Sequence, residues 1–202
     1  MPTLSLARLA LALALFAGVT AFALSPAGAR WDRAVATWVE RAAPGPDVPA
    51  VGLVFLADPE VVGPGLVLAG AVLLARRDRR GGWKLLWLAA AAAVVSLVAV
   101  ALKYMIVHPG PPPEFVRQIA RPAVTTYSTP YGFPSGHTMR TTLLAGTLLW
   151  RLPIASAAIV LAIMASLVYL GDHWATEVFG GLCLGWACVE LARGGAARLG
   201  LR

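Results

Sequence analysis

Apolar segments of bilayer-spanning length constrain this chain more than any other feature. Crossing roughly 30 Å of hydrocarbon takes about 20 apolar residues in a helix. Segments close to that length lie near residues 5–24, 50–75, 83–107, 135–150, 153–171 and 174–193. Of the 202 residues, 58% are hydrophobic and 13% are charged, so a water-soluble fold could not bury this apolar surface. We therefore expect one all-α membrane domain over residues 1–202, a bundle of six transmembrane helices.

Two of the expected helices carry special features. The second apolar segment is interrupted at Asp58-Pro59-Glu60, which predicts a kink or a helix that begins near Val61. The first segment has small residues after it and also resembles a signal peptide. Because five more spans follow it, we expect this first helix to be retained. Residues 31–43 place Trp and Val along one stripe, which predicts a helix lying in the membrane interface after the first span.

Clusters of basic residues predict the orientation in the cell membrane. Four arginines and a lysine crowd residues 76–84, and Arg151 and the arginines after residue 192 fall on the same expected side. Cytoplasmic loops carry such an excess of Lys and Arg, so both chain ends are expected to be cytoplasmic. The Pro-rich loop 108–134 is then extracytoplasmic, together with the three histidines. This role in orientation, rather than binding to nucleic acid, explains the net charge of +7.

The tetrapeptide Pro134-Ser135-Gly136-His137 opens the fourth expected helix and suits an anion site. Proline at a helix start wastes no donor, serine caps the helix, and glycine lets the backbone approach a ligand. The helix N-terminus then offers free N–H groups and the positive end of its dipole to a phosphate. His137 lies close enough to reach the same anion. The alternative is a plain capping motif with an incidental histidine.

A second group of ionisable residues lies at the start of the sixth expected helix. His173 and Glu177 are four residues apart, a spacing that lets the carboxylate bond one imidazole nitrogen. The other nitrogen is then free to attack phosphorus. The alternative is an interfacial Trp174 beside a histidine with no catalytic role. Lys103 ends the third expected helix at the same membrane face, so the topology brings it towards both histidines.

Over residues 83–193 these segments resemble the type 2 phosphatidic acid phosphatase superfamily, which includes membrane lipid phosphatases and vanadium haloperoxidases. The family pattern has a Lys separated from Arg-Pro by six residues, then Pro-Ser-Gly-His, then Ser-Arg, five residues, His, three residues and Asp. The matching positions in this chain are Lys103 with Pro111, the whole of Pro134 to His137, and Ser166 with His173; Glu177 stands at the acidic position.

The resemblance implies a phosphatase for a lipid phosphate or an isoprenoid diphosphate that needs no metal and no organic cofactor. In that mechanism His173 attacks phosphorus to form a phosphohistidine, His137 protonates the leaving oxygen, and Glu177 orients His173. The phosphoryl oxygens would be held by Lys103, Ser135 and the Gly136 N–H. Undecaprenyl diphosphate, phosphatidic acid and phosphatidylglycerol phosphate all fit this chemistry, and the loop sequence does not select among them.

The chain departs from the family pattern at two arginines. Gly110 and Leu167 stand where the pattern has Arg, and a lysine cannot replace the bidentate contact of a guanidinium with phosphate. We expect Arg140, one helical turn after His137, to compensate. The other candidates for this role are Arg117, Arg121 and His108. Two further hypotheses stay open: a catalytically impaired relative that binds or moves phospholipid, and a transporter or small channel suggested by the broken second helix.

Overall fold

Helices make up the described part of the chain. The structure, a computed structural model, describes residues 4–41, 45, 47–117, 119 and 129–201. Within these ranges the helices are α1 (Leu6–Ala23), α2 (Pro26–Arg41), α3 (Asp47–Leu56), α4 (Pro59–Ala75), α5 (Arg79–Met105), the short 3-10 helix η1 (Pro113–Phe115), α6 (Gly136–Leu148), α7 (Pro153–Tyr169) and α8 (Ala175–Arg198). The all-α class predicted from the sequence is confirmed.

The helices differ in their ability to cross a bilayer. By length and composition α1, α5 and α8 are candidate spans, and the bent pair α3 and α4 adds a fourth. Helix α7 is apolar but has 17 residues. Helix α6 has 13 residues, about 20 Å of helix, which is short of the bilayer thickness. Threonines and an arginine of α6 are buried inside the bundle, so its polar side chains face protein. Six full-length spans are therefore more than the helix lengths support.

The break predicted in the second apolar segment is present. Helix α3 ends at Leu56, α4 begins at Pro59, and the two helices are bent by 55°. Proline has no N–H to continue the α3 ladder, and the last turn tightens, with the Asp58 N–H donating to the carbonyl of Phe55 at 3.1 Å. Helix α4 thus starts two residues before the expected Val61. Pro64 lies inside α4 without ending it.

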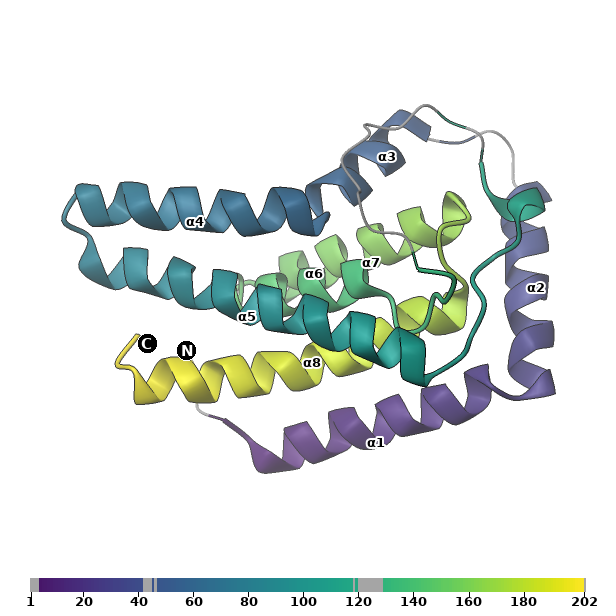
Figure 1. The fold of residues 1–202 in the computed structure, drawn as a ribbon, viewed down its shortest axis with the longest axis horizontal. Helices are drawn as coiled ribbons and strands as arrows, with labels where there is room; N and C mark the ends of the chain where they lie inside the picture. The colour runs from purple at the N-terminus through teal and green to yellow at the C-terminus, as the bar shows by residue number, and fades with distance from the viewer. Residues whose placement is uncertain (1–3, 42–44, 46, 118, 120–128, 202) are drawn as a thin grey trace.

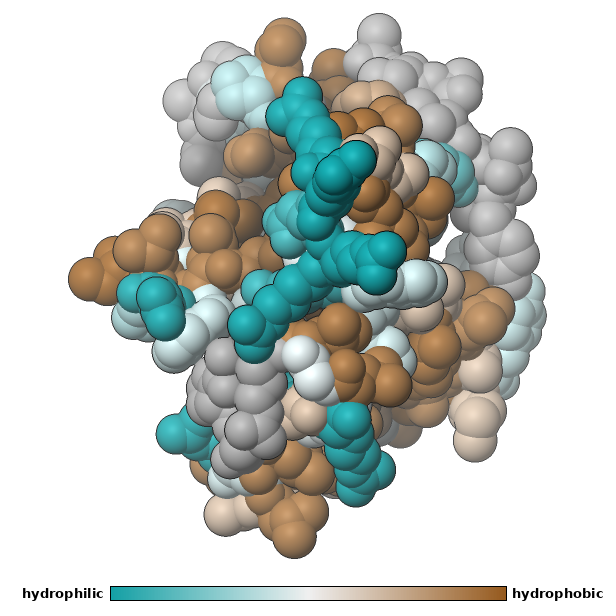
Figure 2. Space-filling view, turned by 90° about the vertical axis from the view of Figure 1, so that its left-hand side faces the viewer, coloured by the Kyte–Doolittle hydropathy of each residue, from teal (hydrophilic) through white to brown (hydrophobic). Residues whose placement is uncertain are grey.

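Most of the long helices run roughly along the long axis of the molecule, and α2 lies across one end of them (Figure 1). Helix α2 occupies the segment expected for an interfacial helix but begins at Pro26, five residues earlier than predicted. The opposite end holds both termini and the α4–α5 connection (Figure 1). Figure 2 looks onto that end, where hydrophilic side chains extend across the centre with hydrophobic ones around them.

Glycines on α8 allow α6 to approach closely. A Cβ at Gly185 would lie 2.8 Å from the Cβ of Thr142 and 2.9 Å from the carbonyl oxygen of Met139. Met139 is fully buried in the main core cluster, which α5 and α1 complete. Small residues at helix contacts let backbones pack at short distance inside a membrane. The start of α6, with its tetrapeptide, is held against α8 in this way.

The N-terminal helices are also tied to α8. The Ser5 N–H donates to the Glu190 carboxylate at 3.1 Å, and the Asp32 carboxylate accepts from the N–H and the hydroxyl of Thr176 at 2.9 and 2.6 Å. Burial raises the pKa of Asp32, and both hydrogen bonds from Thr176 oppose that shift. These contacts involve α1, α2 and both ends of α8. Retention of the first helix stays a prediction.

The contact of α8 with α6 leads to a stability prediction. Gly185→Ala forces a methyl group against the α6 backbone, so we expect it to lower the free energy of unfolding by about 1–3 kcal/mol. Thermal unfolding of the protein in detergent measures this effect. Gly18→Ala in α1 is the control because no atom lies within 4 Å of an added Cβ there. Equal unfolding temperatures for the two variants would contradict the close packing of α6 on α8.

Candidate active site

A cavity of about 680 Å³ lies where the α3–α4 break, α5, the start of α6 and the α7–α8 turn meet. Five of the seven residues predicted for the site line it: Lys103, Gly136, His137, Arg140 and His173. The other two, Ser135 and Glu177, lie behind this lining with no exposed surface. Sequence segments about 70 residues apart thus converge on one cavity, as the expected topology requires.

The His173 imidazole is bonded by a buried carboxylate. Its Nδ1 lies 2.6 Å from Oε2 of Glu177, the contact that their spacing of four residues predicts. The backbone N–H of Trp174 donates to the same oxygen at 3.2 Å. Since Nδ1 is engaged, Nε2 is the nitrogen of His173 left for chemistry in the cavity. The geometry suits a nucleophile oriented by a third group.

A second histidine shares the Glu177 carboxylate. His108 Nδ1 lies 3.1 Å from Oε1 of Glu177, so the carboxylate joins two imidazoles. The backbone closes over this pair at Gly132, where an added Cβ would lie 2.0 Å from the same oxygen. His108 was expected as one candidate phosphate ligand. It lies instead behind the cavity lining and bonds the carboxylate that orients His173.

His137 faces the same cavity from the first turn of α6. Its ring centroid lies 6.3 Å from that of His173, and its Nε2 lies 2.7 Å from Oδ1 of Asp58. Ser135 caps the helix as expected, with its hydroxyl accepting from the Thr138 N–H at 3.4 Å. That hydroxyl is buried within the cap. The Gly136 end of the helix reaches the cavity instead.

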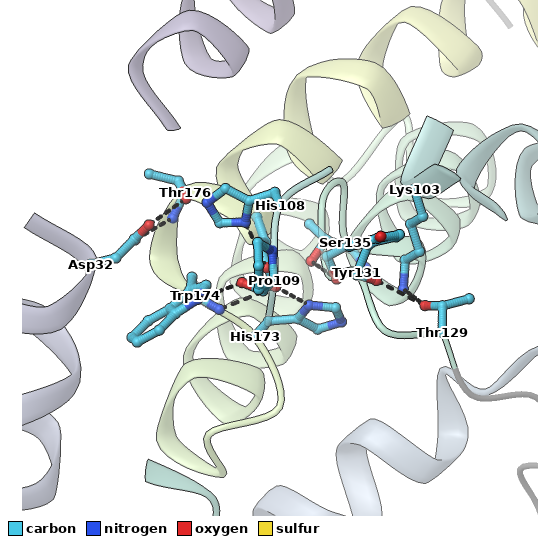
Figure 3. A network of polar contacts seen from close by, with 12 residues as sticks. Asp32, Lys103, His108, Pro109, Thr129, Tyr131, Ser135, His173, Trp174 and Thr176 are labelled. Atoms are coloured by element: carbon cyan, nitrogen blue, oxygen red, sulfur yellow. Dashed lines mark hydrogen bonds and ion pairs between the residues drawn. The ribbon is translucent and has the colours of Figure 1, made fainter. Parts of the chain in front are cut away.

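Two cations border the cavity. Lys103 Nζ donates to the hydroxyl of Thr129 at 3.4 Å (Figure 3). Arg140 donates through Nε and Nη2 to the carbonyl of Ala57 at 3.2 and 3.0 Å, and through Nη1 to the hydroxyl of Ser96 at 3.3 Å. A guanidinium has five N–H donors, and these three bonds leave one N–H on each Nη. Arg140 is therefore both anchored and able to donate to an anion.

The structure also shows where the two positions that carry Arg in the family pattern lie, and where the other candidates for compensation lie. A Cβ at Gly110 would meet no atom within 4 Å, although the residue lines the cavity, whereas Leu167 is fully buried in apolar core. Arg117 does not line this cavity; its Nε donates to the Tyr169 carbonyl at 3.0 Å, and it lines a neighbouring cavity of about 180 Å³ that His173 also borders. Arg121 lies outside the described residues. Of the described candidates for compensation, Arg140 alone lines the cavity that holds both histidines.

Asp58 is the site residue that sequence reasoning missed. We interpreted Asp58-Pro59-Glu60 only as a helix interruption, yet Asp58 bonds His137 and lines the cavity. A signal was available in the sequence, because a carboxylate within an apolar segment needs a polar partner. The identity of that partner was not legible, since His137 is 79 residues away.

Comparison with known proteins agrees with the motifs. The profile described as the PAP2 superfamily matches residues 84–195, more than half of the chain, and the protein belongs to this superfamily of phosphatases. The structure is similar to the crystal structure of a transmembrane PAP2-type phosphatidylglycerolphosphate phosphatase from Bacillus subtilis, with a TM-score of 0.78 and 22% sequence identity over 95% of this chain and 97% of that chain. At this identity the likeness establishes the transmembrane PAP2 fold. No curated protein sequence matches this chain.

The shared carboxylate leads to a prediction at His108. His108→Phe keeps a ring in place but removes the partner of Glu177 Oε1, and a buried polar atom left without a partner costs about 1–3 kcal/mol. We expect a lower unfolding temperature and roughly tenfold slower turnover, the scale of loss seen when an outer-shell partner is removed. Thermal unfolding and phosphate release measure the two effects. His108→Gln restores a donor and should recover part of both; equal behaviour of the Phe and Gln variants would contradict the role.

Proposed function

We propose that the protein is a membrane phosphatase that hydrolyses a lipid phosphate or an isoprenoid diphosphate through a phosphohistidine intermediate. The proposal rests on one observation: two imidazoles from different segments, His137 and His173, border one cavity with their centroids 6.3 Å apart. One phosphoryl group fits between rings at this separation. Lys103 and Arg140 supply positive charge at the same cavity, which suits an anionic substrate.

The reaction has two steps. In the first, Nε2 of His173 forms a bond to phosphorus while the bond from phosphorus to the lipid oxygen breaks, and His137 gives that oxygen a proton. Glu177 accepts the Nδ1–H of His173 and stabilises the imidazolium as it forms. In the second, water attacks phosphorus, His137 takes a proton from it, and the nitrogen–phosphorus bond breaks to release phosphate.

Charge on the phosphoryl oxygens is stabilised by groups that are already in place. The N–H groups at the start of α6 and the positive end of its dipole face an anion bound beside Gly136. Lys103 and the free Nη protons of Arg140 complete the set. Such fixed donors supply much of the catalysis in phosphoryl transfer, where the protein contributes mainly position and charge. The set uses side chains and backbone alone, so we expect a metal-independent reaction.

The proposed setting is the cell membrane, with six crossings that include the shorter α6 and α7. Both termini would be cytoplasmic and the cavity extracytoplasmic. The exposed arginines at the α4–α5 connection support this orientation. Exposed Trp31 and Trp38 on α2 support its position in the interface, where tryptophan is enriched. The phosphatidylglycerolphosphate phosphatase of similar fold makes that lipid a first substrate to test, beside phosphatidic acid and undecaprenyl diphosphate.

A second hypothesis is a relative that binds or moves phospholipid without hydrolysis. It is motivated by Gly110 and Leu167, which stand where the family pattern has arginines. The two histidines on one cavity argue against it, because binding alone has no need for both a nucleophile and a proton donor. Phosphate release therefore separates the two hypotheses.

Loss of the nucleophile should abolish the reaction. We expect wild-type protein in detergent to release phosphate from at least one of the three lipids with EDTA present, and His173→Ala to release none. Quenching during turnover of labelled substrate should trap label on the protein in a form that is labile in acid and stable in alkali, as expected for phosphohistidine. Turnover by His173→Ala, or label with the acid stability of a phosphoserine, would exclude the mechanism.

Arg140 offers a separate test of the proposed compensation. Arg140→Ala removes a guanidinium from the anion site and should abolish phosphate release, leaving less than about 1% of wild-type turnover, because charged donors to a phosphoryl group are worth several kcal/mol. Arg151→Ala is the matched control, since Arg151 is exposed beyond the far end of α6, where it lies over the Trp150 ring, and it should keep near-wild-type turnover. Full activity of a folded Arg140→Ala protein would dispose of compensation by this residue.

A further inference from the structure

Two consecutive residues of the α3–α4 break contact two residues of α6. The Ala57 carbonyl accepts from Nε and Nη2 of Arg140, and Asp58 Oδ1 lies 2.7 Å from Nε2 of His137. Arg140 and His137 are three residues apart and so lie on one face of α6. The break is therefore fitted to this face by two polar contacts, each joining residues about 80 positions apart in the sequence.

The broken helix explains why these acceptors are available. The last carbonyls of a helix have no partner within it, and the Val61 N–H, which a continuous helix would direct to the Ala57 carbonyl, donates instead to the Asp58 carbonyl at 3.1 Å. The Ala57 carbonyl is thus free to accept from a side chain. Asp58 is 8% exposed, and a carboxylate with so little access to water is costly without a bonded partner. His137 provides that partner.

We propose that Asp58 is a positioning residue for His137, which makes the α3–α4 break a part of the active site. The inference rests on the proposed function and concerns a residue outside the segment 84–195 that matches the family profile. Asp58 would orient the His137 ring as Glu177 orients the His173 ring. The two histidines that border the cavity would then each be bonded by a carboxylate, one pair for each chemical role.

The contact fixes which proton moves. With Nε2–H of His137 donating to Asp58, the transferable proton is on Nδ1. Its transfer to the leaving oxygen returns a neutral ring that keeps its Nε2–H bond to Asp58, and Nδ1 then accepts a proton from the attacking water. The charged or titratable groups near His137 are Asp58 from the break, Arg140 on α6 and His173 from the α7–α8 turn. The Asp58 carboxylate offsets the positive charge of Arg140, which would otherwise oppose an imidazolium.

Leaving-group chemistry provides the test. Asp58→Asn is purified as the full-length protein in detergent, and the first-turnover rate of alcohol or phenol release is measured by rapid quench. The two substrates are an alkyl phosphate and a nitrophenyl phosphate of similar size, which differ in the basicity of the oxygen that leaves. An alkoxide needs a proton to leave, so its release should slow by about 100-fold. A nitrophenolate leaves without one, and its release should slow by less than about fivefold. Equal losses on both substrates, or no loss on the alkyl phosphate, would overturn the proposal.

Three further variants make the outcome specific. Asp47→Asn removes a carboxylate from the other end of α3, where it bonds Tyr169, and should not change the rates. In a His137→Ala background Asp58→Asn should cause no further loss on the alkyl phosphate, because the two residues act as a unit; a further tenfold loss would contradict this. If the Asn variant fails to fold, Asp58→Glu displaces the carboxylate and should show the same contrast between substrates to a smaller extent, and equal rates on both would count against the role.

The result is separable from the proposed function itself. His173→Ala should be inactive on both substrates whatever Asp58 does. If His173→Ala is inactive and Asp58→Asn shows no leaving-group contrast, the phosphohistidine mechanism stands and the role of Asp58 fails. If His173→Ala keeps turnover, the proposed function fails, whatever the behaviour of the Asp58 variants.

Discussion

The buried carboxylate of Glu177 is the interaction on which the candidate site depends. It has no exposed surface, and its oxygens are engaged by His173, His108 and the Trp174 backbone. In surroundings of low dielectric constant an unpartnered carboxylate would be costly, whereas one with several donors is held firmly. The Glu177 carbonyl also accepts from the Ser135 N–H at 3.0 Å. One residue at the start of α8 therefore bonds His173, His108 at the beginning of the Pro-rich loop, and the start of α6 together.

Other carboxylates in the bundle are also bonded to a polar partner. Asp58 pairs with His137, Asp32 binds the start of α8 through Thr176, and Glu190 binds Ser5 and Arg193 near its end. Each carboxylate joins segments that are distant in sequence or fixes a helix terminus. Apolar burial is non-directional, so the contacts of Asp58 and Asp32 add to the close packing of α6 on α8 in positioning the helices near the cavity. This explains how helices as short as α6 can present two residues to one anion.

The sequence predicted the features that depend on local spacing. The apolar segments indicated the helices, the tetrapeptide marked the N-terminus of α6, and the separation of His173 and Glu177 by four residues indicated their contact. Features that depend on tertiary packing were not accessible. The burial of the α6 threonines depends on the helices packed around them, and no periodicity reveals that His108 turns towards Glu177. The partner of Asp58 is fixed by the 55° bend between α3 and α4, an angle that proline makes possible but does not determine.

The walls of the cavity bear on the kind of substrate. One side carries the histidines and cations, while the α3 side and the facing turn of α5 contribute apolar side chains, namely Val51, Val54, Phe55 and Val100. A small hydrophilic phosphate would leave that apolar wall in contact with water, whereas a lipid phosphate would cover it with its first methylene groups, each worth about 0.8 kcal/mol when buried. Because Ala57 and Asp58 directly follow α3, the helix that offers this apolar wall leads into the segment that bonds Arg140 and His137. Under the proposed function, a lipid chain lying along α3 would therefore contact the helix that leads into the segment bonded to His137 and Arg140.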